Sequence, residues 1–211
     1  MLNQTKSTRK VRISRKKTLK INKLYEGLSG FGLADAAQNS NVTYGELKAE
    51  SIPILYEIYS RYAPLSNILS SYRNFYDLGC GVGKIVLGLT ALNSSLKGVG
   101  IELVSERIQQ ANTALQRLRD TSIKQRVEFI CLSFLDDSIN YSNACWIFIS
   151  NLCFTDDTKQ QLVEKLEREL NTGSIVVCSK ELNSTKFEQL NHITLPMSWS
   201  DESKVYVYKK I

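Results

Sequence analysis

The sequence predicts an α/β fold in which a seven-stranded, mostly parallel β-sheet carries helices on both faces. Three observations support this prediction. From residue 74 onward, short apolar runs alternate with amphipathic stretches at intervals of about a dozen residues, as in parallel sheets with crossover helices. The first apolar run leads into a glycine-rich turn at residues 79–83. The chain has 211 residues, of which 43% are hydrophobic, so it is long enough to bury one core of ordinary size.

A helix over residues 51–62 precedes the alternating region. Its apolar side chains recur every three to four positions, Ser51 is placed to cap its start, and Pro53 is tolerated in its first turn. Compact apolar runs and amphipathic stretches then predict a strand at residues 74–78, a helix at 84–92, a strand at 99–103, a helix at 105–119, and strands at 126–132 and 144–149.

The last part of the chain completes the sheet. Leucines spaced by four residues define a helix over residues 158–170, and Gly173 is placed to end it. A buried strand follows at residues 174–179. Two further strands are predicted at residues 194–195 and 204–209, the latter from its alternation of valine and tyrosine.

Composition excludes several classes of protein. The longest apolar runs fall short of the roughly 18 residues needed to span a bilayer, which favours a soluble globular chain. Five cysteines, an odd number with no C-x-x-C pair, lie mostly inside apolar runs, and we interpret them as reduced core thiols of an intracellular protein. The single histidine, His192, argues against a multi-histidine metal centre and a Ser-His-Asp triad, so no metal is expected.

Residues 1–25 form a basic arm. They contain nine Lys and Arg and no acidic residue, whereas the remainder carries 18 basic against 21 acidic residues, a net charge of −3. This asymmetry favours contact with a polyanion, and nucleic acid is preferred to a membrane because the arm lacks a strong apolar face. A flexible tail, a nuclear-import signal and a mitochondrial presequence are the alternatives. The candidate nucleic-acid-binding residues are Arg9, Lys10, Arg12, Arg15, Lys16, Lys17 and Lys20.

The glycine-rich turn marks a candidate ligand site, because parallel sheets bind ligands at the carboxyl ends of their strands. It reads D-L-G-C-G-V-G-K from Asp77 to Lys84, and Glu102 follows at the end of the next predicted strand, where an acid can accept both ribose hydroxyls of a nucleoside. A dinucleotide site must cradle a pyrophosphate, which the Asp77 carboxylate would repel. S-adenosylmethionine has no phosphate and carries an ammonium group that an acid can hold, so the turn favours this methyl donor.

Further motifs extend along most of the chain. In order, they are T-Y-G-E at residues 43–46, V-E-F with S-F at 127–134, N-L-C-F at 151–154, S-W-S at 198–200 and V-Y-V-Y at 205–208. Together with the glycine-rich turn, this series resembles the disruptor-of-telomeric-silencing (Dot-one) family of non-SET histone lysine methyltransferases. The resemblance implies a seven-strand Rossmann-like methyltransferase fold, S-adenosylmethionine as methyl donor, and methylation of a lysine in the globular core of histone H3 in nucleosomes.

The resemblance also implies roles for individual residues. The methyl donor would be held by Tyr44, Glu46, Asp77, Gly79, Cys80, Gly81, Gly83, Lys84, Glu102, Ser133, Phe134 and Ser150, and the channel for the acceptor lysine would involve Tyr44, Ser150, Asn151, Phe154, Trp199 and Tyr206. Three positions depart from the family pattern. Ser133 replaces the acid that holds the adenine amino group, Lys84 replaces a glutamine, and the asparagine of the channel mouth is displaced, leaving Ser150 and Asn151.

On this interpretation residues 1–25 are the basic arm, 26–50 a docking segment with a loop that closes over the methyl donor, and 51–211 the methyltransferase domain. We expect a monomeric, nuclear or chromatin-associated enzyme whose partner is the nucleosome, with the arm on DNA and no membrane contact. Two alternatives stay open: an enzyme of the same fold that methylates another lysine protein or RNA, and a module that binds the methyl donor without turnover.

Overall fold

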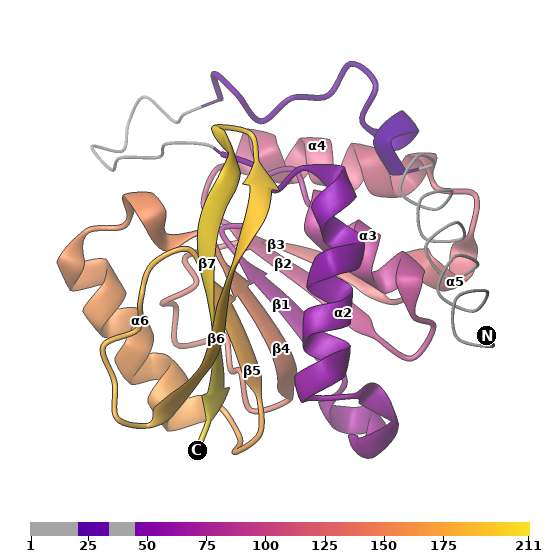
Figure 1. Ribbon diagram of the computed structural model, residues 1–211. Helices are drawn as coiled ribbons and strands as arrows, with labels where there is room; N and C mark the ends of the chain where they lie inside the picture. The colour runs from indigo at the N-terminus through magenta and orange to yellow at the C-terminus, as the bar shows by residue number, and fades with distance from the viewer. Residues whose placement is uncertain (1–20, 34–44) are drawn as a thin grey trace, which may run out of the picture.

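A seven-stranded sheet in the order β3–β2–β1–β4–β5–β7–β6 forms the centre of the molecule, which is described by a computed structural model covering residues 21–33 and 45–211 (Figure 1). The first five strands are parallel, while β7 runs antiparallel to both β5 and β6. The predicted fold class is therefore confirmed. No helix in the described ranges is both long and apolar enough to cross a membrane.

The elements follow the predicted order. The strands are β1 (Asn74–Leu78), β2 (Lys97–Glu102), β3 (Val127–Cys131), β4 (Ala144–Ile149), β5 (Ile175–Cys178), β6 (Phe187–Met197) and β7 (Ser200–Lys210). The helices are α2 (Ile52–Tyr62), α3 (Lys84–Leu92), α4 (Ser105–Arg117), α5 (Thr121–Lys124) and α6 (Asp156–Glu169), with short 3₁₀ turns at Ala49–Ser51, Leu65–Asn67, Ser70–Tyr72 and Asn151–Cys153.

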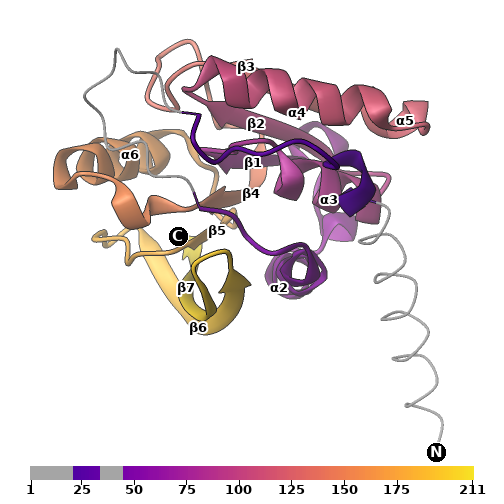
Figure 2. The ribbon, with the colours of Figure 1, turned by 90° about the horizontal axis from the view of Figure 1, so that it is seen from above.

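Helices cover both faces of the sheet. On one face α2 and α3 pack against the strands, where the ring of Tyr59 stacks on that of Trp146 with centroids 4.9 Å apart. On the other face α6 buries Leu162 and Leu166 against the apolar side chains of β1, β4 and β5. Figures 1 and 2 show α6 and the α2–α3 pair on opposite sides of the strands. The two cores hold the carboxyl ends of β1 and β4 side by side.

The largest departure from prediction is β6. Only residues 194–195 were expected to be extended, but the strand runs from Phe187 to Met197 and pairs along its length with β7. As the edge strand of the sheet, β6 leaves most of its polar side chains exposed, so it lacks the apolar pattern of a buried strand.

Two smaller predictions about helix ends are wrong. The Ser51 hydroxyl does not cap α2; it donates instead to the carbonyl of Pro196, 3.0 Å away, and so ties the helix to β6. The helix predicted from residue 158 begins at Asp156, because the Thr155 side chain accepts a hydrogen bond from the Thr158 amide at 3.1 Å.

All five cysteines are free thiols, but only three lie in the core. Cys80, Cys145 and Cys178 are buried, whereas Cys131 and Cys153 are exposed, so the expectation of core thiols is wrong for these two. Cys131 ends the edge strand β3 and Cys153 lies in the 3₁₀ turn after β4, and both positions face solvent despite their apolar neighbours in the sequence.

Residues 21–33 pack along α4. Arg117 donates from Nη1 to the carbonyls of Leu24 and Glu26, each at 2.8 Å, and the Ser29 amide donates to the side chain of Gln110 at 2.6 Å. Seen from above, this segment passes across the ends of β1 and β2 (Figure 2). It therefore lies at the edge of the sheet where the predicted ligand site is found. Residues 34–44 and the arm residues 1–20 lie outside the described ranges.

Candidate active site

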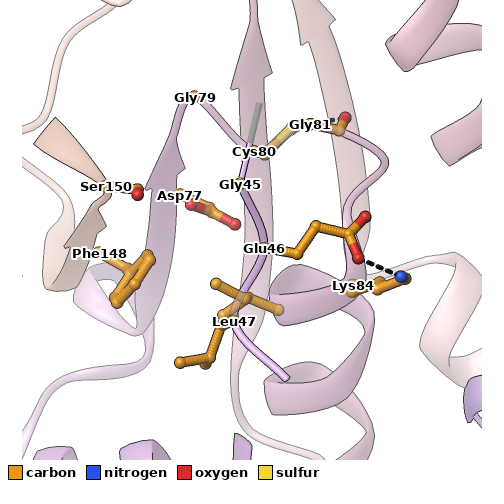
Figure 3. Close-up of a pocket in the computed structure, with 11 residues that line it drawn as sticks. Gly45, Glu46, Leu47, Asp77, Gly79, Cys80, Gly81, Lys84, Phe148 and Ser150 are labelled. Atoms are coloured by element: carbon orange, nitrogen blue, oxygen red, sulfur yellow. Dashed lines mark hydrogen bonds and ion pairs between the residues drawn. The ribbon is translucent and has the colours of Figure 1, made fainter. Parts of the chain in front are cut away.

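A cleft opens at the carboxyl ends of β1 and β4, between the glycine-rich turn and residues 45–47 (Figure 3). It is lined by Gly45, Glu46, Leu47, Asp77, Gly79, Cys80, Gly81, Lys84, Ile85, Phe148 and Ser150. The structure thus brings together seven of the residues that the sequence analysis singled out: Glu46, Asp77, Gly79, Cys80, Gly81, Lys84 and Ser150.

The glycine-rich turn is bent over the end of β2. The amides of Gly79 and Cys80 both donate to the carbonyl of Ile101, at 2.8 and 2.9 Å. Gly83 has a φ of +78°, and a Cβ built there would lie 2.3 Å from the Phe129 ring, so both its backbone and its packing require glycine. The turn brings main-chain atoms close to the cleft and presents the first turn of α3 to it.

Asp77 is one of two acidic residues that line the cleft. Its side chain is 2% exposed, and among the described residues its Oδ2 atom has no hydrogen-bond partner. Burial raises the pKa of this carboxyl well above its usual value, and the charge of Glu102 adds to the effect. A buried carboxylate without a partner is unfavourable unless a cation or a hydrogen-bond donor meets it, so Asp77 is suited to a positively charged ligand group.

Glu102 supports the turn and does not line the cleft. Its two carboxylate oxygens accept hydrogen bonds from the amides of Gly81 and Val104, each at 3.0 Å. Arg107 lies 3.7 Å away and is itself buried, and it also donates to the carbonyl of Gly30 at 3.3 Å. Glu102 therefore joins the turn after β1, the start of α4 and the segment 21–33.

Glu46 and Lys84 form an ion pair across the cleft (Figure 3). Lys84 is the first residue of α3, and Glu46 is positioned by the hairpin of β6 and β7: its amide donates to the Ser198 hydroxyl at 3.0 Å, and its carbonyl accepts from the Ser198 amide at 2.7 Å. The two side chains are 14% and 25% exposed, so the charges are partly screened from water.

Two predicted aromatic residues, Phe154 and Trp199, lie next to glycines of the cleft lining. The ring of Phe134 stacks on that of Phe154 at 5.1 Å, and a Cβ built on Gly79 would lie 4.0 Å from the Phe154 ring. Trp199, at the tip of the β6–β7 hairpin, covers Gly45 so closely that a Cβ there would lie 2.2 Å from its ring, while 42% of the residue stays exposed.

Other predicted residues lie away from the lining. Asn151 is 2% exposed and bonded to the main chain of Lys180, and the Ser133 hydroxyl accepts from the Leu135 amide at 3.2 Å. Tyr206 pairs with Cys178 across the strands, and Lys204 lies 4.8 Å from its ring centroid. Tyr44 and the seven candidate residues of the basic arm lie outside the described ranges.

Sequence reasoning missed four lining residues. Gly45 and Leu47 flank the predicted Glu46, and Ile85 follows the predicted Lys84, so proximity to a motif was a usable signal for them. Phe148 lies inside β4, opposite Asp77, and nothing in a buried apolar run distinguishes the residue that faces a cleft.

A family model described as histone methylation protein DOT1 matches residues 31–210, most of the chain. The chain belongs to the DOT1 family. A protein-lysine N-methyltransferase of Saccharolobus islandicus is 29% identical to this DOT1-family chain over 102 residues, which are 48% of the chain and 58% of that protein. The DOT1-family chain thus spans little more than half the length of this curated relative.

Solved structures share the fold of the DOT1-family chain. A protein of Pyrococcus horikoshii, provisionally described as an RNA methyltransferase, has a TM-score of 0.60 and 11% identity over 94% of this chain and 98% of its own. A Staphylococcus aureus protein, provisionally described as a caffeoyl-CoA O-methyltransferase, has a TM-score of 0.61 and 11% identity over 90% and 92%. At this identity the likeness shows the methyltransferase fold alone.

Proposed function

We propose that this DOT1-family chain is an S-adenosylmethionine-dependent protein-lysine N-methyltransferase. The observation that carries the proposal is the buried, unpartnered Oδ2 of Asp77 in a cleft formed by the glycine-rich turn. S-adenosylmethionine would supply a methyl group on a cationic sulfonium. The amino-acid end of this methyl donor carries an ammonium group, which can pair with the unpartnered Asp77 carboxylate. The methyl donor contains no phosphate that this carboxylate would repel.

The chain's residues fit the remaining parts of this methyl donor. Glu102 uses its two oxygens on the amides of Gly81 and Val104, but an ionised carboxylate has about four acceptor sites, so capacity is left for ribose hydroxyls. The stacked pair Phe134 and Phe154 offers an apolar surface beside Gly79, and Ser133 next to it stands at the adenine side.

To methylate the acceptor lysine, the site must align the reacting atoms and favour loss of the lysine's proton. It does not need a strong base. Methyl transfer to an amine is a direct displacement, so holding the reacting atoms in line supplies much of the acceleration. We assign the walls of the acceptor channel to Tyr44, Trp199 and Tyr206, with Phe154 and Ser150 near its floor and Asn151 next to Ser150. An apolar channel beside a cationic group lowers the pKa of an amine by desolvation and like charge, which favours the reactive neutral form.

For the substrate, we propose the globular-core lysine of histone H3 in nucleosomes, and a place for the enzyme on chromatin in the nucleus. The description of the family as a histone methylation protein supports this assignment, as do the nine basic residues in residues 1–25. The arm would hold nucleosomal DNA through its phosphates. A second candidate is a lysine on a different protein, because the relative's name specifies a lysine but no histone.

Labelled S-adenosylmethionine, offered in parallel with nucleosomes, free histone octamer, unrelated lysine-rich proteins and RNA, tests the proposal. Label on one core lysine of H3 in nucleosomes is expected, and an Asp77→Ala variant should lose it, whereas Asp137→Ala, at an exposed acid, should not. Label on another protein would select the second candidate. Binding of the methyl donor with no transfer to any acceptor, or transfer to RNA alone, would contradict the lysine assignment.

A further inference from the structure

Tyr25 is a buried side chain with an unused hydroxyl. The residue is 6% exposed, and its ring packs with Val82 in the glycine-rich turn and with Leu87, Ala114 and Leu115. Among the described residues its hydroxyl has no hydrogen-bond partner. A buried hydroxyl without a partner is unfavourable by roughly 1–3 kcal/mol. Its retention at this position therefore needs an explanation.

The surroundings of Tyr25 are those of the cleft. The Lys84 ammonium lies 5.4 Å from its ring centroid. Burial raises the pKa of the Tyr25 hydroxyl well above its usual value, and the charges of Cys80, Glu46 and Asp77 raise this pKa further. All three of these groups, and Lys84 itself, line the cleft. Tyr25 is not itself one of the residues that line the cleft, but it lies next to Lys84, which does and which forms the ion pair with Glu46.

We infer that Tyr25 and Lys84 together bind the carboxylate at the amino-acid end of the methyl donor, and that Glu46 holds Lys84 in place until this carboxylate arrives. The inference rests on the proposed function. It adds a residue from outside the sheet domain to the site, and gives the Lys84 substitution in the glycine-rich turn a role in binding.

The charges of the cleft support a zwitterionic partner. An α-amino acid end carries one cation and one anion on neighbouring atoms. The cleft offers the matching pair, with the Asp77 carboxylate for the ammonium and the Lys84 ammonium for the carboxylate, and the Tyr25 ring lies beside Lys84. A polyphosphate would meet two carboxylates, Asp77 and Glu46, and is disfavoured by both.

This role does not follow from membership of the family. The family match begins at residue 31, and Tyr25 precedes it. What holds Tyr25 next to Lys84 is α4, since Arg117 donates to the carbonyls on either side of it, at Leu24 and Glu26. The position of the hydroxyl is therefore a property of how residues 21–33 pack in this chain.

A Tyr25→Phe variant tests the inference by binding and not by turnover. Isothermal titration would compare S-adenosylhomocysteine, which keeps the amino-acid end, with 5′-methylthioadenosine, which lacks it. Loss of a hydrogen bond to a charged group should weaken S-adenosylhomocysteine binding by about tenfold or more and leave 5′-methylthioadenosine unchanged. Tyr72→Phe, at an exposed tyrosine that does not line the cleft, is the matched control and should change neither affinity.

A Lys84→Gln variant supplies the second measurement. It should also weaken the binding of S-adenosylhomocysteine and leave that of 5′-methylthioadenosine unchanged. The double variant should lose less affinity than the product of the two single fold-changes, because both groups bind one carboxylate. Unchanged S-adenosylhomocysteine affinity in Tyr25→Phe would overturn the inference, as would an equal loss for both ligands. If the wild-type chain binds neither ligand, the proposed function fails instead.

The stability of the Tyr25→Phe variant gives a further test. Because the hydroxyl is unpartnered, Tyr25→Phe should melt no lower than wild type without ligand, and a clearly lower melting temperature would also count against the inference.

Discussion

The side-chain amide of Asn151 is bonded in both directions to the main chain of Lys180. The Lys180 amide donates to Oδ1 at 2.8 Å, and Nδ2 donates to the Lys180 carbonyl at 3.4 Å. Asn151 follows β4 and Lys180 follows β5, so this contact fastens together the two strand ends that lie beside the cleft. A residue assigned to the acceptor channel is thus also a structural link.

Replacing Asn151 by alanine should therefore reduce stability as well as activity. Both bonded groups of Lys180 would lose a partner in a buried place, and we expect the free energy of unfolding to fall by about 1–3 kcal/mol. Urea unfolding measures this, with Asn191→Ala as control, since Asn191 is exposed and its side chain accepts a hydrogen bond from the adjacent His192 amide. A variant with unchanged stability but lost methyl transfer would show that Asn151 acts on the substrate alone.

Asp77→Asn should stabilise the ligand-free protein at neutral pH. Because burial raises the folded-state pKa of Asp77, the wild-type protein is favoured below the unfolded-state pKa and loses stability as pH rises through the folded-state value. The amide variant has no such loss, so the difference in melting temperature should grow from acid to neutral pH. Its affinity for S-adenosylhomocysteine should fall at the same time. A variant that melts lower than wild type at pH 7 would mean that the ionised carboxylate is compensated within the protein.

Gly83→Ala should destabilise the fold far more than Gly27→Ala. The two residues have nearly equal φ angles, +78° and +73°, so both variants strain the backbone by about 1–2 kcal/mol. Only at Gly83 does a Cβ also meet the Phe129 ring, whereas nothing lies within 4 Å at Gly27. Overpacking adds about 1–3 kcal/mol. Chemical denaturation of both variants tests the difference, and equal losses would show that the Phe129 ring moves aside freely.

Gly45→Ala should displace the Trp199 ring. The new Cβ would lie 2.2 Å from the present position of the Trp199 ring, so the ring must move. Because Trp199 is 42% exposed, the ring can turn toward solvent. We therefore expect the free energy of unfolding to fall by less than about 1 kcal/mol. The change should alter Trp199 fluorescence and raise KM for the protein acceptor. In a Trp199→Ala background the same substitution should have no effect, and a persisting effect would place its cause elsewhere.

The central strands of the parallel sheet, β1, β4 and β5, could be predicted from the sequence because they are buried on both faces. For β1 and β4, continuous apolar runs gave the observed limits, and β5 and β3 end within one residue of prediction. The edge strand β6 could not be recognised, because exposed polar side chains and the partner strand β7, rather than an apolar pattern, decide its extent.

The site was predictable where its residues belong to one short motif. Asp77, Gly79 and Lys84 lie within eight positions of the sequence, and Glu46 belongs to T-Y-G-E. Tyr25 and Phe148 could not be found in this way, since their relation to the cleft depends on packing between segments distant in the chain. For the same reason nothing in the sequence indicated that Asn151 would bond a residue 29 positions later.

Three side chains of α4 hold residues 21–33 through hydrogen bonds to main-chain atoms: Arg117 and Arg107 bond carbonyls, and Gln110 bonds an amide. The segment is thus positioned by polar side chains of α4 together with its own buried Ile21 and Tyr25. Its exposed side chains can therefore change during evolution without loss of the segment's position. Comparison of close relatives should therefore find α4 positions 107, 110 and 117 restricted and the exposed positions 22, 23 and 26 variable.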